Sequence, residues 1–196
     1  MDLYYNNPVD RFNDLCQGST LSQHFLSLSS DISPVNFVTE MVEHLWHCRP
    51  TLFPSPTQLM FTVFCKNIIT RMSVLPTTLF LALKYIHRIR QSSPNLSPSE
   101  GSEYQVFIAS LILAHKFLED DTYTNQAWSD ISKIPVEQIN KMEKQFLKGI
   151  NYNLNVSQEE FIQWVTYLEG YLSYRSTVQM LTTPQPTTTF ACNGMM

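Results

Sequence analysis

The segment from Ser102 to Leu118 limits the possible folds most, because it has the length of a helix and no polar side. Its apolar positions follow one another almost without a break: Val106, Phe107, Ile108, Ala109, Leu111, Ile112, Leu113 and Ala114. A helix that is apolar all round is buried all round. The segment is shorter than the roughly 20 residues of a membrane span. We therefore expect the central helix of a helical bundle.

The other helices are marked by starting signals. A hydroxyl side chain caps free N–H groups and proline suits the first turn, and such residues precede each apolar run of helical period. The predicted helices run from Pro34 to near Cys48 and over 57–71, 77–90, 102–118, 135–150 and 157–172. No comparable run alternates apolar and polar residues, so the predicted fold class is all-α.

The ends of the chain differ from its middle. Residues 1–32 are polar and rich in Ser and Asn, and we expect an N-terminal arm that is loosely held or packs on a partner. Residues 173–196 are rich in Thr and Pro, a composition that buries too little surface to offset the entropy of ordering. We predict a flexible arm at each end and one domain over 33–172.

Composition limits the partners and the cellular location that we expect for the protein. The 196 residues carry a net charge of −4, which disfavours nucleic acid as a partner. Four widely separated cysteines favour free thiols in a reducing compartment, and no signal peptide or membrane segment is visible. The expected location is inside the cell, in nucleus and cytoplasm, with no membrane partner.

Two charged residues interrupt apolar helical surfaces. At about 100° per residue, Glu143 lies about 40° from Ile139, within the apolar face of its helix. Lys116 lies near the end of the fully apolar helix, where it can snorkel to solvent and complement the helix dipole. Glu143 needs a donor. That donor is either internal, with Lys116 as a candidate, or part of a second polypeptide.

No catalytic or metal-binding constellation is predicted. His44-x-x-His47-Cys48 has a spacing compatible with zinc, but no further ligand cluster is evident. His87, on the flank of an apolar face, is interpreted as a satisfied core histidine. There is no nucleophile–base pattern and no phosphate-binding glycine loop, so we expect no catalytic residue, no metal and no cofactor.

Three segments resemble consecutive pieces of a cyclin box: LFLALKYIHRIR (79–90), EYQVFIASLILAHKFLEDDTY (103–123) and INKMEKQFLKGINYNL (139–154). The forms ILAHKFLEDD and NKMEKQFLKGINYNL and the short Ser-Pro-rich insert at 91–99 are most similar to fungal PCL cyclins, partners of a phosphate-responsive cyclin-dependent kinase. The resemblance implies a single five-helix cyclin box, formed by the predicted helices from 57 to 172 and preceded by the helix from Pro34.

The resemblance also implies a function and a binding site. A cyclin forms a heterodimer with its kinase, activates it and helps to choose its substrates, here in cell-cycle or phosphate signalling, and is not itself an enzyme. The kinase-binding residues implied are Lys116, Glu143, Leu113, Phe117, Tyr152 and Leu154. The chain departs from many cyclins in two ways: it lacks the Arg–Asp pair between the first two box helices, having His87 at the Asp position, and it has no M-R-x-x-L run.

Other functions and modifications remain open at the level of sequence. A transcription-associated cyclin fold that contacts DNA or polymerase is the alternative, disfavoured by the negative charge, and an α-helical enzyme is disfavoured by the lack of catalytic residues. Ser93 and Ser97 precede proline and are candidate phosphosites. Thr183-Pro184 with Thr187 resembles a phosphodegron that a ubiquitin-ligase adaptor would read.

Overall fold

The computed structural model describes Phe12, Asp14 and residues 34–48 and 56–182, with side chains through residue 178. From residue 34 onward these residues form helices and no strand, which confirms the all-α prediction. The helices are α3 (Pro34–His47), α4 (Pro56–Arg71), α5 (Pro76–Ser92), α6 (Ser102–Leu118), α7 (Asn125–Ser132), α8 (Val136–Gly149) and α9 (Gln158–Thr182). No helix among them is long and apolar enough to cross a membrane.

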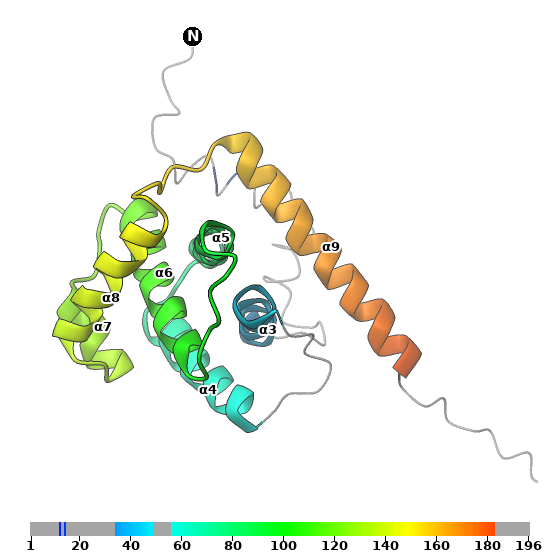
Figure 1. The fold of residues 1–196 in the computed structure, drawn as a ribbon, viewed down its shortest axis with the longest axis horizontal. Coiled ribbons are helices and arrows are strands. Elements are labelled where there is room, and N and C mark those ends of the chain that lie inside the picture. The colour runs from blue at the N-terminus through cyan, green and yellow to red at the C-terminus, as the bar shows by residue number, and fades with distance from the viewer. Residues whose placement is uncertain (1–11, 13, 15–33, 49–55, 183–196) are drawn as a thin grey trace, which may run out of the picture.

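Helix α6 is the centre of the bundle, as its lack of a polar side predicts (Figure 1). It packs against α3, α5 and α8, and its buried residues occupy every direction around its axis. Helix α5 contributes a second buried row, which includes Phe80, Tyr85 and Ile86. The short helix α7 packs on α8 and α4 and inserts the fully buried Trp128.

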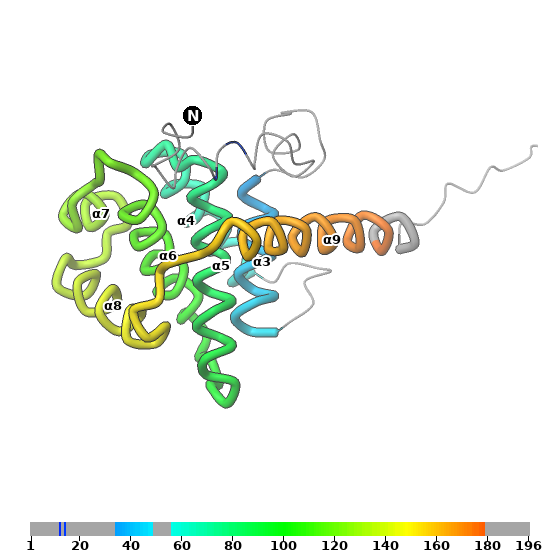
Figure 2. Tube along the Cα trace, turned by 90° about the horizontal axis from the view of Figure 1, so that it is seen from above, coloured from blue at the N-terminus to red at the C-terminus, as the bar shows by residue number. Residues whose placement is uncertain are grey.

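Helix α9 lies along the outside of α5 and α3 and then continues past them (Figure 2). The Trp164 Nε1–H donates to the carbonyl of Phe80 in α5 at 2.8 Å. Arg175 Nη2 lies 2.6 Å from Glu40 Oε1 in α3. The Phe12 ring packs against α9, since it is buried and its centroid lies 4.4 Å from that of Phe161. At least this part of the N-terminal arm therefore packs on the chain itself.

The prediction that the last helix ends at 172 is wrong, because α9 continues to Thr182. Its extension is rich in hydroxyl groups, and those of Ser173, Ser176 and Thr177 each donate to the carbonyl four residues earlier. Arg175 adds the ion pair to α3. The predicted flexible tail thus begins at least ten residues too early, and its remainder, from 183, lies outside the described residues.

Helix α7 was absent from the prediction. It begins after Thr124, whose hydroxyl accepts from the Ala127 N–H at 3.3 Å, and ends at Lys133 in the left-handed region. Cys48 and Cys65 are free thiols, as expected, and the other two cysteines lie outside the described residues.

Candidate functional site

The two charged residues that the sequence singles out meet each other. Lys116 in the last turn of α6 places its Nζ 2.7 Å from Oε1 of Glu143 in α8. Asn125 Nδ2, at the start of α7, donates at 2.7 Å to Glu143 Oε2 and at 2.7 Å to Asn140 Oδ1. Three helices that follow one another in the chain therefore converge on one carboxylate.

The donor that Glu143 needs is internal, the first of the two alternatives. The idea that both charges wait for a second polypeptide is wrong for the free chain, because each has a partner within it. The pair is nevertheless accessible: the Lys116 side chain is 34% exposed and that of Glu143 15%. An ion pair at such a surface contributes only about 0–1 kcal/mol. The ion pair therefore positions the two charged groups, and little free energy is lost when a partner separates them.

Tyr152 stands out from the turn after α8. Asn151 and Tyr152 have φ angles of 53° and 56°, in the left-handed region that costs a non-glycine residue about 1–2 kcal/mol. The Tyr152 N–H donates to the carbonyl of Leu147 at 2.7 Å, which closes the turn. The side chain is left 64% exposed. A large aromatic ring is thus exposed on a turn whose left-handed backbone conformation must be stabilised by contacts with the rest of the chain.

The remaining predicted contact residues differ in accessibility. Leu113 is only 3% exposed and belongs to the core, so at most the edge of its side chain is available to a partner. Phe117 and Leu154 are half-buried and pack against the core, which leaves part of each accessible.

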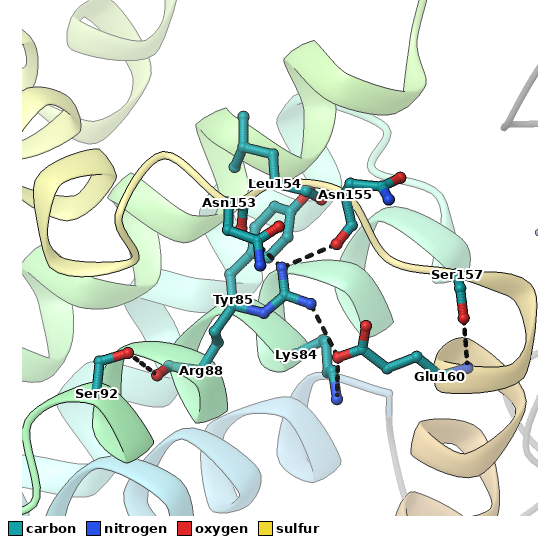
Figure 3. Close-up of polar contacts among 9 residues, drawn as sticks. All are labelled: Lys84, Tyr85, Arg88, Ser92, Asn153, Leu154, Asn155, Ser157 and Glu160. Atoms are coloured by element: carbon teal, nitrogen blue, oxygen red, sulfur yellow. Dashed lines mark hydrogen bonds and ion pairs between the residues drawn. The ribbon is translucent and has the colours of Figure 1, made fainter.

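The segment formed by Asn153, Leu154 and Asn155 is held by side chains from α5 (Figure 3). Arg88 Nη1 donates to the carbonyls of Asn153 at 2.7 Å and Asn155 at 3.1 Å. The Tyr85 hydroxyl donates to the carbonyl between them, that of Leu154, at 2.8 Å. Burial raises the pKa of Tyr85, so its hydroxyl remains a donor. We call residues 153–155 the strap.

The same arginine ties the strap to α9. Arg88 Nη2 lies 2.8 Å from Glu160 Oε1, and Lys84 Nζ lies 2.9 Å from the same oxygen. Burial opposes ionisation of Glu160, but hydrogen bonds from Lys84 and Arg88 lower its pKa overall. Sequence reasoning missed Arg88. No local signal marks it, because its partners lie 65 to 72 residues further along the chain.

The histidines behave differently from the sequence interpretation. His44 turns toward α9, where its Nε2 lies 3.2 Å from the Tyr167 hydroxyl, whereas His47 faces α6. The two imidazoles therefore do not form the site that their spacing allows. His87 is half-buried against Trp164, with ring centroids 5.1 Å apart, but its Nδ1 has no hydrogen-bond partner among the residues that the structure describes. The interpretation of His87 as a satisfied core residue is thus wrong for that nitrogen.

The candidate phosphosites are only partly described. Ser97 is exposed and Ser93 half-buried, both in the connection between α5 and α6. Thr183 and Thr187 lie outside the described residues.

The arrangement defines an all-α protein built around a buried central helix. Its charged pair joins two helices, its exposed aromatic ring lies in the turn after α8, and all three residues fall within the segments that resemble a cyclin box. The cyclin family model matches residues 55–154, half of the chain, and the chain belongs to the cyclin family. This range contains α4 to α8. The matched range thus includes α7, which the sequence prediction lacked, and ends before α9.

Curated relatives confirm the likeness to fungal PCL cyclins. The chain is 34% identical over 113 residues to the G1/S-specific cyclin pas1 of Schizosaccharomyces pombe, covering 54% of the chain and 26% of pas1. It is 32% identical over 108 residues to PHO85 cyclin-5 of Saccharomyces cerevisiae, covering 53% of the chain and 47% of that protein. Cyclin-U4-1 of Arabidopsis thaliana is 26% identical over 109 residues, with 56% of the chain and 54% of the relative covered.

The chain thus spans about a quarter to a half of the length of these relatives. A search of solved structures found no match.

Proposed function

We propose that this cyclin is the regulatory subunit of a cyclin-dependent protein kinase of the kind named in its PHO85-cyclin relatives. Membership of the family and the names of those relatives support the proposal. The observation that carries it is the accessible Lys116–Glu143 pair, which lies within the family-matched range and joins α6 to α8. The proposed complex is a heterodimer to which this chain contributes no catalytic group.

The proposed mechanism is a shift of population in the kinase. A protein kinase is active only when its Lys–Glu ion pair and its metal-binding loop are aligned. A partner that binds only the aligned position of the mobile helix raises the population of that state. Lys116 and Glu143 would bond main-chain groups beside that helix, and Phe117, Tyr152 and Leu154 would supply apolar contact to it. Substrate choice in cell-cycle or phosphate signalling, in nucleus and cytoplasm, belongs to the same proposal.

The test is capture of the kinase by full-length variants. Lys116→Ala and Glu143→Ala should each weaken the complex five- to tenfold and lower kinase activity in proportion, while the far-ultraviolet circular dichroism stays that of a folded helical protein. Lys141→Ala, an exposed position on α8, is the matched control and should bind as well as the wild type. Equal binding by both charge variants and the wild type would refute this interface.

The same preparation tests the alternative class. A transcription-associated protein that contacts DNA would shift a duplex in a salt-dependent manner. The net charge of −4 predicts no such shift. For the proposed degron, a Thr183→Ala chain should have a longer half-life in cells, and an unchanged half-life would remove the ubiquitin-ligase adaptor from the set of partners.

A further inference from the structure

Helices α3 and α6 bring three metal-ligating side chains together, away from the Lys116–Glu143 pair. Glu43 and His47 are four residues apart on α3, which places them on one face of that helix. Glu103 lies in the first turn of α6. One ligand atom from each residue lies within 4.8 Å of those of the other two. His47 Nε2 is 3.0 Å from Glu103 Oε2.

The cluster is buried and rich in negative charge. Glu43 is 8% and Glu103 6% exposed, and the His47 side chain is 4% exposed. The negative field extends to a neighbour, because burial and then the charges of Glu103 and Glu43 raise the pKa of the Cys65 thiol. Buried carboxylates of this kind require cations or protons.

A cavity of about 130 Å³ adjoins the cluster and has room for the solvent ligands that a bound ion would keep. Among the residues that the structure describes, its lining includes a further acid, Glu100, but no lysine or arginine. The imidazole makes the ligand set softer than the all-oxygen sets that Ca²⁺ and Mg²⁺ prefer.

We propose that Glu43, His47 and Glu103 bind one divalent transition-metal ion, with Zn²⁺ the best match to one imidazole and two carboxylates. Zinc is bound at about 2.0–2.2 Å from such ligands, usually with four ligands in a tetrahedron. Neighbouring ligand atoms are then about 3.3–3.5 Å apart. Binding would draw the three ligand atoms, which lie within 4.8 Å of one another, to these separations, and the adjoining cavity would admit water as the fourth ligand. The ion would fasten the helix that precedes the cyclin box to the central helix of the box.

The test uses the full-length chain, freed of metal with a chelator and titrated with Zn²⁺ against a chromophoric competitor. We expect one Zn²⁺ per chain and a melting temperature that rises with Zn²⁺ concentration, because an ion that binds the folded state stabilises it. His47→Gln and Glu103→Gln should each weaken Zn²⁺ binding at least tenfold. His44→Gln is the matched control: it removes an imidazole from the same helix, one that faces Tyr167 instead, and should bind Zn²⁺ as the wild type does.

Three results would overturn the proposal: no stoichiometric Zn²⁺ binding by the folded chain, unchanged affinity in Glu103→Gln, or an equal loss in His44→Gln. The first would mean that His47 and Glu103 form an ion pair only. If Glu103→Gln fails to give a helical circular dichroism spectrum, Glu43→Gln decides in its place. A Glu43→Gln chain that is folded and binds Zn²⁺ with unchanged affinity also refutes the site.

Discussion

Replacing Arg88 with methionine tests whether the strap positions the turn at Tyr152, which the proposed kinase would contact. The substitution keeps most of the length of the side chain and removes the guanidinium, with its bonds to the carbonyls of Asn153 and Asn155 and to Glu160. Tyr85 would still hold the carbonyl of Leu154. We therefore expect a loosened strap in a chain that remains folded.

The magnitude follows from the bonds that are lost. A hydrogen bond contributes about 0.5–1.5 kcal/mol net, and one between charged groups about 1.5–3 kcal/mol. The bond to Glu160 belongs near the bottom of that range, because the Glu160 side chain is 37% exposed and Lys84 still pairs with it. The free energy of unfolding should fall by about 2.5–4.5 kcal/mol, or the melting temperature by roughly 5–18 °C for a chain of this size.

The effect on kinase binding should be separate and measurable. With a loose strap, the left-handed conformation of Asn151 and Tyr152 must be fixed on binding, at about 1 kcal/mol for each residue. The dissociation constant should therefore rise about thirtyfold. Affinity is measured by titration at a temperature at which both chains are folded. Arg90→Met is the matched control, because Arg90 on the same helix bonds the local carbonyls of Ser93 and Leu96. A destabilised Arg88→Met chain with wild-type affinity would refute the positioning role.

Further predictions concern pH and packing. Burial raises the pKa of Glu40 to about 7 despite the attraction of Arg175, so its contribution to stability is full below pH 4.5 and is lost as pH rises through 7. Between pH 4.5 and 8, the free energy of unfolding measured in urea should fall more for the wild type than for Glu40→Gln. Parallel pH profiles of the two chains would contradict this prediction. Gly149→Ala should destabilise by about 1 kcal/mol, because its Cβ would lie 2.7 Å from Ile89 Cδ1. Gly170→Ala, whose Cβ would meet no atom of the described residues within 4 Å, should instead stabilise by about 0.5–1 kcal/mol, and urea unfolding that reversed the two signs would contradict the packing.

The sequence is sufficient for the parts of the fold that rest on local rules. The absence of a polar side on α6 predicts its central place, and proline at the start of α4 and α5 predicts their first turns to within a residue. These signals work because burial around a whole helix and satisfaction of free N–H groups are dictated by neighbouring residues in the chain.

The sequence predictions fail where contacts between residues far apart in the chain determine the structure. Helix α7 has only eight residues, too few for a clear apolar period, and depends on the burial of Trp128 among other helices. The composition of the final turns of α9 predicts a polar tail, because the sequence does not reveal that Arg175 pairs with Glu40, 135 residues away. Arg88 is similar: its partners 65 to 72 residues on leave no pattern near it in the sequence.

The internal pairing of Lys116 and Glu143 changes what a partner must supply. If both charges were buried without partners, removing one would cost about 3–5 kcal/mol by leaving the other uncompensated. Here Glu143 keeps Asn125 as a donor when Lys116 is lost, and the Lys116 ammonium remains open to solvent when Glu143 is lost. A kinase that binds here would exchange one set of hydrogen bonds for another of similar strength. Specificity would then come from the geometry in which α6, α7 and α8 hold the pair, while most of the affinity would come from the apolar contacts of Phe117, Tyr152 and Leu154.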